Sequence, residues 1–353
     1  IQSLKVYETF MPPVGGTADR PTDVKPGMVY YNKDFKTIEF WDGNFWKQVD
    51  NTTRSCRVIY AGGNPGSSPN TKSDIEFLNA MTKGNTSSFG DLTESVRNKG
   101  GGSSSTRAIF GNGASPNSTS NTDVIEYVTI QSAGNSIDFG NSTAGRRNAG
   151  GASNSTRFLM AGGYVSSASN IIDYVQINTL GNALDFGDLR ISKYYPAGIP
   201  SPIRAVFAGG TTPGNTETMS FVKFASKGNA VNFGELSSGG GTFQSGGASD
   251  GVRGVLAGTY NPTATYINNI EYLTIASEGN TTHFGSLTVG RSASGSSGGT
   301  RGIFAGGSTG SYTNTIDFIQ IATTGNAEDF GDISEKSTGM AGVSDAHGGL
   351  GGF

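Results

Sequence analysis

The sequence predicts an all-β fold, a six-bladed β-propeller that follows a small N-terminal β module. Three observations predict it: a unit that recurs at intervals of 47 to 50 residues, four short strand-like segments in each unit, and abundant Gly combined with 10% aromatic residues. Four strands in a repeat of this length are typical of blades arranged radially around an axis. Gly and Asn suit tight turns, and aromatic side chains fill sheet interiors. We therefore expect the module in residues 1–53 and the propeller in residues 54–353.

Three landmarks define the repeat. Each copy opens with an Arg before an apolar run, continues with a Gly-Asn pair, and has a Phe-Gly pair whose Phe lies five residues after the first Gly. This offset is the same in all six copies, so chance composition does not explain it. The arginines are Arg57, Arg107, Arg157, Arg204, Arg253 and Arg301; the glycines of the Gly-Asn pairs are Gly84, Gly134, Gly181, Gly228, Gly279 and Gly325; the phenylalanines are Phe89, Phe139, Phe186, Phe233, Phe284 and Phe330.

The last copy predicts the order of strands. Residues 301–305 form an apolar strand ending in a diglycine, and residues 315–322 form a middle strand with apolar residues on both faces. Gly325-Asn326 is expected at a tight hairpin turn that needs positive φ, and residues 329–333 form the third strand. The small residues at 291–296 are expected in the innermost strand, because blades converge there and leave little room for side chains.

The frame of the repeats predicts how the ring closes. The first copy opens at Arg57 and lacks an innermost strand of its own, whereas a spare Gly-rich segment, residues 337–350, follows the last copy. We expect this C-terminal segment to supply the innermost strand of the first blade. Such closure removes free sheet edges, which otherwise invite aggregation.

The N-terminal module is predicted to be a small β-hairpin unit. Residues 28–32 and 37–41 alternate apolar and polar side chains, and Asp42-Gly43 turns the chain into residues 45–49. Alternation of this kind indicates half-buried strands. A module of about 50 residues buries little surface alone, so we expect it to pack on the propeller, on another copy of itself or on a larger assembly. Its expected attachment residues are Tyr30, Tyr31, Trp41 and Trp46.

Composition argues against several function classes. The net charge is −3 and no basic block is present, which is a poor match for nucleic acid or an anionic membrane. No apolar run approaches the roughly 20 residues of a membrane span. The single cysteine, Cys56, excludes an internal disulfide framework. We expect neither membrane insertion nor a bound nucleic acid.

The sequence also predicts a protein that is not an enzyme and that has no cofactor or metal. Asp-Phe-Gly occurs at 185–187 and 329–331, but the phosphate loop and strand lysine of a kinase are missing. His283 occupies a strand position that other copies fill with Asp, Asn or Ser, and His347 lies alone in the closing segment. One imidazole does not make a metal site.

The variable loops are the expected recognition surface. In the predicted ring, the loop after the diglycine strand and the loop after Phe-Gly emerge on one face, and both vary between copies. Aromatic rings with Asn and Thr donors suit a glycan or a protein partner. The alternative is that these tyrosines are exposed loop residues with no ligand. The candidate binding residues are Tyr164, Tyr194, Tyr195, Tyr260, Tyr266 and Tyr312.

Two resemblances extend this interpretation. The order of a strand ending in Gly-Gly, a strand with an aromatic residue and a late aromatic resembles kelch repeats over residues 57–353, with Phe-Gly where many kelch blades have Trp. Arg20-Pro21, then Tyr30-Tyr31-Asn32, then Trp41-Asp42-Gly43 resembles segments of tailed-bacteriophage tail and fibre proteins. Kelch-like repeats with Gly-Asn and Phe-Gly are also similar to those in marine phage structural proteins.

Together the resemblances imply a virion protein of the tail-fibre or surface-fibre type, with a trimer as the implied oligomer. Its implied partners are other virion proteins and a host surface glycan or protein. One alternative is a purely architectural virion decoration protein. The other is an extracellular protein, a secreted bacterial lectin or a glycan-active enzyme.

Overall fold

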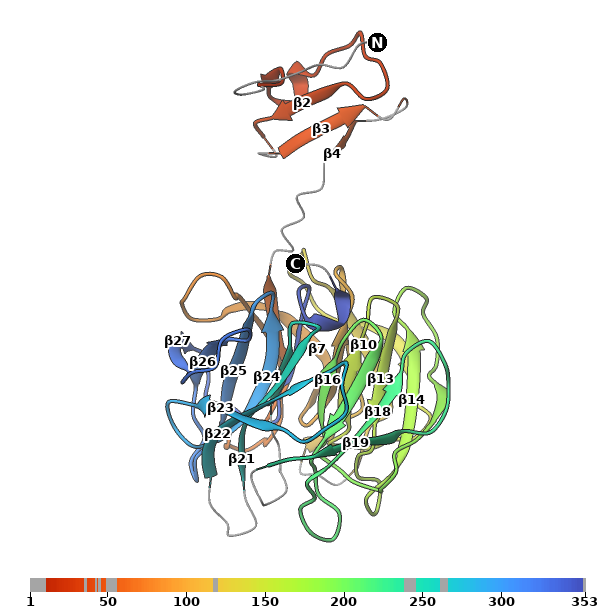
Figure 1. Ribbon diagram of the computed structural model, residues 1–353, viewed down its shortest axis with the longest axis vertical. Helices are drawn as coiled ribbons and strands as arrows, with labels where there is room; N and C mark the ends of the chain where they lie inside the picture. Colours follow the sequence, from red (N-terminus) through yellow and green to blue (C-terminus); the bar gives the residue numbers. More distant parts are fainter. Residues whose placement is uncertain are drawn as a thin grey trace. The chain divides into compact units, whose positions relative to one another are not determined.

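The computed structural model describes residues 11–34, 37–41, 43, 46–48, 56–116, 120–237, 246–260 and 266–351. Within these ranges the chain is all-β, as predicted, and forms seven four-stranded sheets. The chain divides into two compact units, Ile1–Thr53 and Arg54–Phe353 (Figure 1). Each unit is described by itself below.

The first unit contains one sheet with the strand order β1-β2-β3-β4. Strand β1 pairs with β2 in parallel, and the other neighbours are antiparallel. The strands are β1 (Val14–Gly15), β2 (Val29–Asn32), β3 (Thr37–Trp41) and β4 (Trp46–Gln48), with a 3-10 turn at Thr17–Asp19. These strands lie close to the predicted segments 28–32, 37–41 and 45–49. Asp42, Phe45 and Val49 lie outside the described residues.

One face of this small sheet is organised around a buried carboxylate. Glu39 is fully buried, and the Arg20 guanidinium clamps it with two hydrogen bonds of 2.6 and 2.8 Å. These bonds hold the pKa of Glu39 below its ordinary value despite the opposing effect of burial. The Arg of the Arg20-Pro21 pair therefore has a structural role, since it neutralises a charge that would otherwise destabilise the unit.

The second unit contains the other six sheets, each of four strands. In five of them the strands follow chain order. The first sheet is β5 (Arg57–Ala61), β6 (Lys72–Asn79) and β7 (Ser87–Val96) with β28 (Ala341–Ser344); the second is β8 (Gly100–Ser103), β9 (Arg107–Gly111), β10 (Val124–Thr129) and β11 (Ile137–Asn141); the third is β12 (Gly150–Ser153), β13 (Arg157–Ala161), β14 (Ile171–Gln176) and β15 (Leu184–Asp188). The fourth is β16 (Ala197–Pro200), β17 (Arg204–Ala208), β18 (Thr218–Lys223) and β19 (Val231–Glu235); the fifth is β20 (Gly246–Ser249), β21 (Arg253–Tyr260), β22 (Tyr266–Thr274) and β23 (Thr282–Ser286); the sixth is β24 (Ser292–Gly298), β25 (Arg301–Ser308), β26 (Thr315–Gln320) and β27 (Glu328–Asp332).

The first sheet joins the two ends of the repeat region. Strand β28 pairs antiparallel with β5, with Ala341 opposite Ala61 and Ser344 opposite Val58. β28 lies within residues 337–350, the segment expected to supply this strand. The Arg57 N–H also donates a hydrogen bond of 2.9 Å to the Asp345 carboxylate. The C-terminal segment is therefore part of the first sheet.

The innermost strands of the six sheets contact one another in the order β8, β12, β16, β20, β24, β28 and back to β8. This cyclic order is consistent with a propeller-like arrangement. Each of these strands has a Gly where it meets its neighbour, and a Cβ on Gly151 or Gly198 would overlap a carbonyl oxygen of the preceding strand. Glycine is needed there because backbones approach too closely for a side chain. The six are Gly101, Gly151, Gly198, Gly247, Gly295 and Gly342.

The repeat arginines connect each sheet to the next. Arg57 lies over the Phe77 ring of its own sheet, 4.6 Å from the centroid, and donates 2.7 Å to the Ile130 carbonyl of the second sheet. Arg301 of the sixth sheet donates 2.8 Å to the Ala80 carbonyl of the first. The other four arginines make the equivalent bond. A stacked, charged donor therefore bridges every junction, including the one between the last and first sheets.

The Gly-Asn pair has a different role from the one predicted. The hairpin turn comes earlier, where the Ser132 N–H donates 3.3 Å to the Thr129 carbonyl. The Asn135 side chain instead accepts a 3.0 Å hydrogen bond from the Asp91 N–H of the preceding sheet. A Cβ on Gly90, of the Phe-Gly pair, would overlap the Gly134 carbonyl. The two motifs meet across the junction, which explains their constant spacing. Gly-Asn lies in the hairpin connection, as predicted, but after the tight turn rather than at it.

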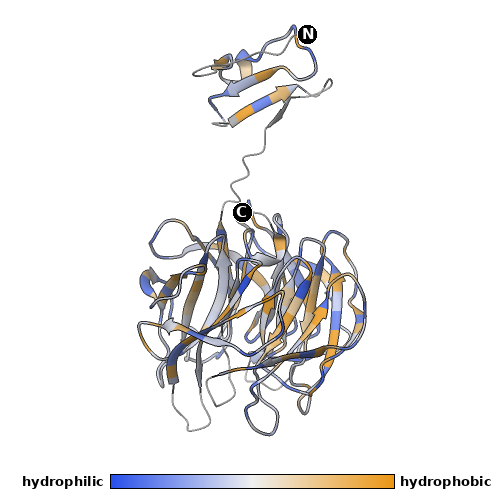
Figure 2. Ribbon diagram, viewed as in Figure 1, coloured by the Kyte–Doolittle hydropathy of each residue, from blue (hydrophilic) through white to orange (hydrophobic). Residues whose placement is uncertain are grey.

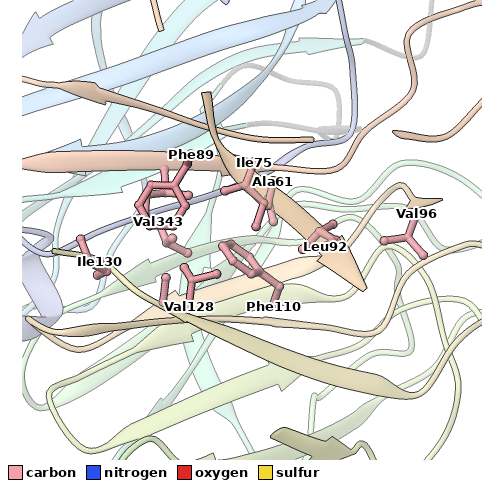
Figure 3. Close-up of a cluster of buried hydrophobic side chains, with 12 residues drawn as sticks. Ala61, Ile75, Phe89, Leu92, Val96, Phe110, Val128, Ile130 and Val343 are labelled. Carbon is pink, nitrogen blue, oxygen red and sulfur yellow. The ribbon is translucent and has the colours of Figure 1, made fainter. Parts of the chain in front are cut away.

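Apolar side chains between adjacent sheets form the core. Figure 2 shows apolar residues along the strands of the second unit. At the first junction, Ile75 and Phe89 pack with Phe110 and Val128 of the second sheet and with Val343 of β28 (Figure 3). Since every sheet is covered on both faces, middle strands with apolar residues on both faces are expected and found.

Candidate functional site

Two kinds of irregular segment meet at one end of the second unit, which we call the loop face. They are the loops that follow β5, β9, β13, β17 and β25, and the segments that precede the innermost strands. Isolated bridges join them in four places: Asn64 with Thr338, Arg97 with Ala114, Arg147 with Tyr164, and Tyr194 with Thr211. The loops are therefore held by backbone hydrogen bonds to the scaffold beneath them.

Three of the predicted tyrosines come together on the loop face. The Tyr164 and Tyr194 ring centroids are 5.5 Å apart with an interplanar angle of 79°, and Tyr194 and Tyr195 are 5.5 Å apart at 52°. The Arg147 guanidinium lies 4.5 Å from the Tyr164 centroid. All four side chains are half-buried. We call Arg147, Tyr164, Tyr194 and Tyr195 the tyrosine row.

The other predicted tyrosines do not join this row. Tyr260 and Tyr266 face each other across β21 and β22, with ring centroids 4.9 Å apart. Tyr312 lies against Gly66, and its hydroxyl accepts a 3.1 Å hydrogen bond from the Asn64 side chain. The six candidates thus form three groups, of which the tyrosine row is the largest.

The predicted attachment residues of the first unit are split between the two faces of its sheet. Tyr30, Trp41 and Trp46 lie on the face of Glu39, with rings 5.7 to 5.8 Å apart, and the Tyr30 hydroxyl donates to the Gly16 carbonyl. Tyr30 is buried, so it stabilises the unit rather than offering a binding surface. Tyr31 lies on the opposite face beside Ile38, which is 41% exposed.

A pocket of about 170 Å³ lies where the innermost strands converge. Its wall comes from all six strands and is dominated by Gly, Ala and Ser. Innermost strands are sheet edges, so their outer row of backbone N–H and C=O groups has no partner strand. Serines of neighbouring strands bond some of these groups, as the Ser153 Oγ accepts from the Ser103 N–H at 2.8 Å, and the others give the wall neutral donors and acceptors. Among the described lining residues Lys99 alone is charged, and it is paired with Glu126 at 2.8 Å.

The rim of the pocket on the loop face is a row of left-handed residues. Asn98, Asn148, Tyr195 and Gly339 have φ of 60°, 61°, 60° and 68°. Each of the first three donates its N–H to the carbonyl of the rim residue of the preceding sheet. The bonds run from Asn98 to Gly339 at 2.8 Å, from Asn148 to Asn98 at 3.0 Å, and from Tyr195 to Asn148 at 2.7 Å. Asn and Gly tolerate this conformation, whereas a bulky residue such as Tyr195 is strained in it. Tyr195 belongs both to this rim and to the tyrosine row.

The C-terminal segment forms the floor of the pocket. His347 lines the pocket and is followed by a 3-10 turn at Gly348–Leu350. Its Nδ1 accepts from the Gly349 N–H at 3.1 Å, so Nε2 carries the proton and donates to the Ser103 carbonyl at 2.9 Å. These two hydrogen bonds hold the imidazole in place at the floor of the pocket, where its role is structural. His283, the other histidine, bonds the Asn269 side chain at 2.7 Å in an exposed position.

A buried carboxylate recurs at the sheet junctions. It precedes the aromatic residue on which the repeat Arg stacks, and a hydroxyl from the preceding sheet bonds it. In the third sheet this hydroxyl is Thr143, at 2.8 Å from Asp173. The residues at this position are Glu76, Glu126, Asp173, Glu271 and Asp317, with Ser220 in the fourth sheet.

Basic side chains neutralise several of these carboxylates. Arg146 pairs with Asp173, and Arg291 pairs with Asp317 at 2.9 Å, all four being fully buried. For Glu126, burial raises the pKa, but Lys99 and the surrounding hydrogen bonds outweigh it and hold the pKa below its ordinary value. In each pair the two buried groups bond each other, so we assign the pairs a structural role.

The fourth sheet breaks the pattern. Lys193 takes the place of Arg146 and is 1% exposed, but Ser220 stands where a carboxylate would be. Its ammonium reaches only the carbonyls of Thr218 and Phe207, at 2.9 and 3.3 Å. Among the described residues no carboxylate lies within ion-pair distance of it. Burial lowers the pKa of Lys193 to about 7.

The sequence interpretation missed Lys193 and the junction carboxylates. The available signal was an acidic residue directly before the aromatic residue of the second predicted strand. Five copies have this acid, and the fourth copy has Ser220 instead. In the described part of the chain, no three His, Cys, Asp or Glu side chains are grouped as a metal site requires. No helix among those residues is long and apolar enough to span a membrane.

Comparison with known proteins adds no relative to this picture. No protein-family profile matches the chain, and no curated protein matches it.

Proposed function

We propose that residues 54–353 are a six-bladed kelch-like β-propeller that serves as a rigid binding scaffold in a bacteriophage virion, as part of a tail fibre or surface fibre. The cyclic contacts of the innermost strands and the Arg bridge from the sixth sheet to the first support the ring. The virion assignment rests on the resemblances in the sequence. The partners would be other virion proteins and a host surface glycan or protein.

The tyrosine row carries the proposal of a binding role. Half-buried aromatic rings pinned by bridges to a rigid sheet lose little conformational entropy when a partner docks. They offer apolar faces with hydroxyl groups at their edges, a combination that suits glycans and proteins alike. We therefore propose binding rather than catalysis, with the loop face directed at the partner.

The first unit is proposed to attach or to oligomerise the chain, in a trimer if the fibre resemblance holds. The outer face of its sheet carries exposed apolar side chains, including Val14 at 43% and Phe40 at 36%. Light scattering on the full chain and on residues 54–353 tests this. We expect a trimer only when the first unit is present, and a monomer in both cases would contradict it.

The binding role is tested with the full chain on host cells and on a glycan array. The variant Tyr164→Ala/Tyr194→Ala should reduce binding at least tenfold, while the control Tyr260→Ala/Tyr266→Ala, a pair of the same size elsewhere, should retain it. Equal binding by both variants would refute the role of the row. Detection of the chain in purified virus particles by mass spectrometry tests the virion assignment, and its absence there would favour a secreted protein.

A further inference from the structure

The axial pocket offers a specific chemistry at the inner end of the tyrosine row. We infer that it binds one neutral pyranose ring, the terminal sugar of a glycan, with Tyr195 against the sugar at the rim. This deepens the proposed function and rests on it in one respect, that the natural ligand is a cell-surface glycan.

Size and shape limit the ligand to a single ring. A cavity of about 150 Å³ accommodates benzene, so a pocket of about 170 Å³ accepts one six-membered ring and not an oligosaccharide. The floor at His347 is closed by hydrogen bonds to its neighbours. The ligand must therefore enter from the loop face, past Tyr195.

The chemistry of the wall selects a neutral polyhydroxylated ligand. Sugar hydroxyls donate and accept hydrogen bonds, as the free edges of the innermost strands require. Lys99 is already neutralised by Glu126, so no charged group of the described lining is left to recognise an ion. A neutral sugar can form hydrogen bonds with the wall and brings no charge into a site that has no countercharge for it.

Two buried polar atoms of the lining point to a ligand independently of the wall. Asn148 is 7% exposed and Ser296 is 4% exposed, and both line the pocket. The Asn148 Oδ1 and the Ser296 Oγ have no hydrogen-bond partner among the described residues. Buried polar atoms without a partner are rare in native proteins and call for one. Neighbouring atoms cover both of them in the ligand-free chain, so a sugar hydroxyl would supply the missing partner once the two side chains turn toward the pocket.

The strained rim residue fits the same role. In the two preceding sheets the equivalent residue is Asn98 or Asn148, which adopts φ near 60° with little strain. Tyr195 replaces Asn at this one position although its backbone is strained there. Tyr195 is one of the residues that line the pocket, and its ring contacts the Tyr194 ring. An aromatic ring at a pocket mouth can stack on the apolar face of a pyranose, which gives the strain a functional reason.

The test is saturation-transfer NMR on the full chain with the methyl glycosides of glucose, galactose, mannose and N-acetylglucosamine. At least one glycoside should receive saturation from the wild-type protein. Ser294→Met, which fills the pocket, should abolish the signal, and Tyr195→Asn, which restores the rim residue of the neighbouring sheets, should weaken binding at least tenfold. The control Val252→Asn, at an exposed residue outside the pocket lining, should bind like the wild type. Circular dichroism and the melting temperature verify that each variant is folded.

Two outcomes would overturn the site: no saturation transfer to any glycoside, or an undiminished signal in folded Ser294→Met. Either result could occur while Tyr164→Ala/Tyr194→Ala still loses host-cell binding, in which case the proposed function stands and only the pocket fails. Saturation transfer that Ser294→Met removes, together with unimpaired cell binding by the tyrosine-row variant, would instead support the pocket and refute the row.

Discussion

The third and fourth sheets each bury a basic side chain at the same position, but only the third sheet places a carboxylate beside it. In the third, Arg146 donates to the Met160 carbonyl and pairs with Asp173, the residue opposite Met160. In the fourth, Lys193 donates to the Phe207 carbonyl, but the residue opposite Phe207 is Ser220. The backbone geometry is conserved and the countercharge is not.

The difference shows why the two basic residues are not interchangeable. Arg keeps its proton at any ordinary pH, so the third sheet requires a buried carboxylate beside it. Lys can release its proton when buried, and the lowered pKa of Lys193 allows it to remain as a neutral donor. The fourth sheet also carries the strained Tyr195, so two departures from the repeat lie within three residues.

The largest expected effect comes from removing the carboxylate of the third sheet. Asp173→Ala leaves Arg146 buried without a countercharge, which should lower the free energy of unfolding by about 3–5 kcal/mol. The control Ser220→Ala should change it by less than about 1 kcal/mol. Urea unfolding at pH 7 measures both. Equal losses in the two variants would show that the sheets do not differ in this way.

The pH dependence of stability should separate Lys193 from other lysines. Its pKa is about 7 in the folded chain and near 10.5 when unfolded, so between these values the unfolded chain binds more protons and stability rises with pH. Relative to Lys193→Met, the wild type should gain about 2–4 kcal/mol from pH 6.5 to 9.5, at roughly 1.4 kcal/mol per pKa unit. Urea unfolding at both pH values measures this gain.

The matched control for this pH effect is Lys223→Met, since Lys223 is an exposed residue of the same sheet. Its difference from the wild type should stay constant over the same pH range. A constant difference for Lys193→Met as well would show that Lys193 keeps an ordinary pKa in the folded chain.

Restoring the missing carboxylate should have a smaller, stabilising effect. Ser220→Asp places an acid where Asp173 lies in the third sheet, which should raise the pKa of Lys193 and add about 1–2 kcal/mol of stability at pH 7. The gain should be absent in Ser220→Asn, which has the same shape without the charge. Thermal unfolding of both variants measures this gain. A melting temperature of Ser220→Asp no higher than that of Ser220→Asn would show that the fourth sheet does not lack a countercharge for Lys193.

The smallest effect is expected at the rim. Tyr195→Asn relieves about 1–2 kcal/mol of left-handed strain but loses ring contacts with Tyr194 of about 0.5–1.5 kcal/mol. The net change in the free energy of unfolding should be under about 1 kcal/mol. Tyr194→Asn loses ring contacts without relieving strain and should cost more. The reverse order in urea unfolding would show that Tyr195 is not strained.

The repeat made much of the second unit predictable. Fixed landmarks locate strands, because every copy must present the same Arg and Phe to its neighbour, and β5, β9, β13, β17, β21 and β25 all begin at the repeat Arg. The Gly-Asn pair was misplaced because its partner, the Phe-Gly strand, lies in the adjacent sheet. A single copy of the repeat contains no trace of that contact.

The candidate site was less predictable for the same reason. The loop tyrosines could be named from the sequence, but the contacts of Tyr164 with Tyr194 depend on loops from adjacent sheets. The pocket needs all six innermost strands at once. Lys193 could be recognised only by noticing that Ser220 replaces an acid, since its partners are backbone carbonyls that any sequence supplies.

The most direct test of the account is whether the two ends of the repeat region share the first sheet. Val58 and Ser344 lie opposite each other on β5 and β28, close enough in an antiparallel pair for a disulfide. In a Cys56→Ser background, Val58→Cys/Ser344→Cys should form an intramolecular disulfide on mild oxidation, visible by mass spectrometry of the monomer, and should raise the melting temperature. Free thiols, or disulfides only between chains, would contradict the pairing of β28 with β5.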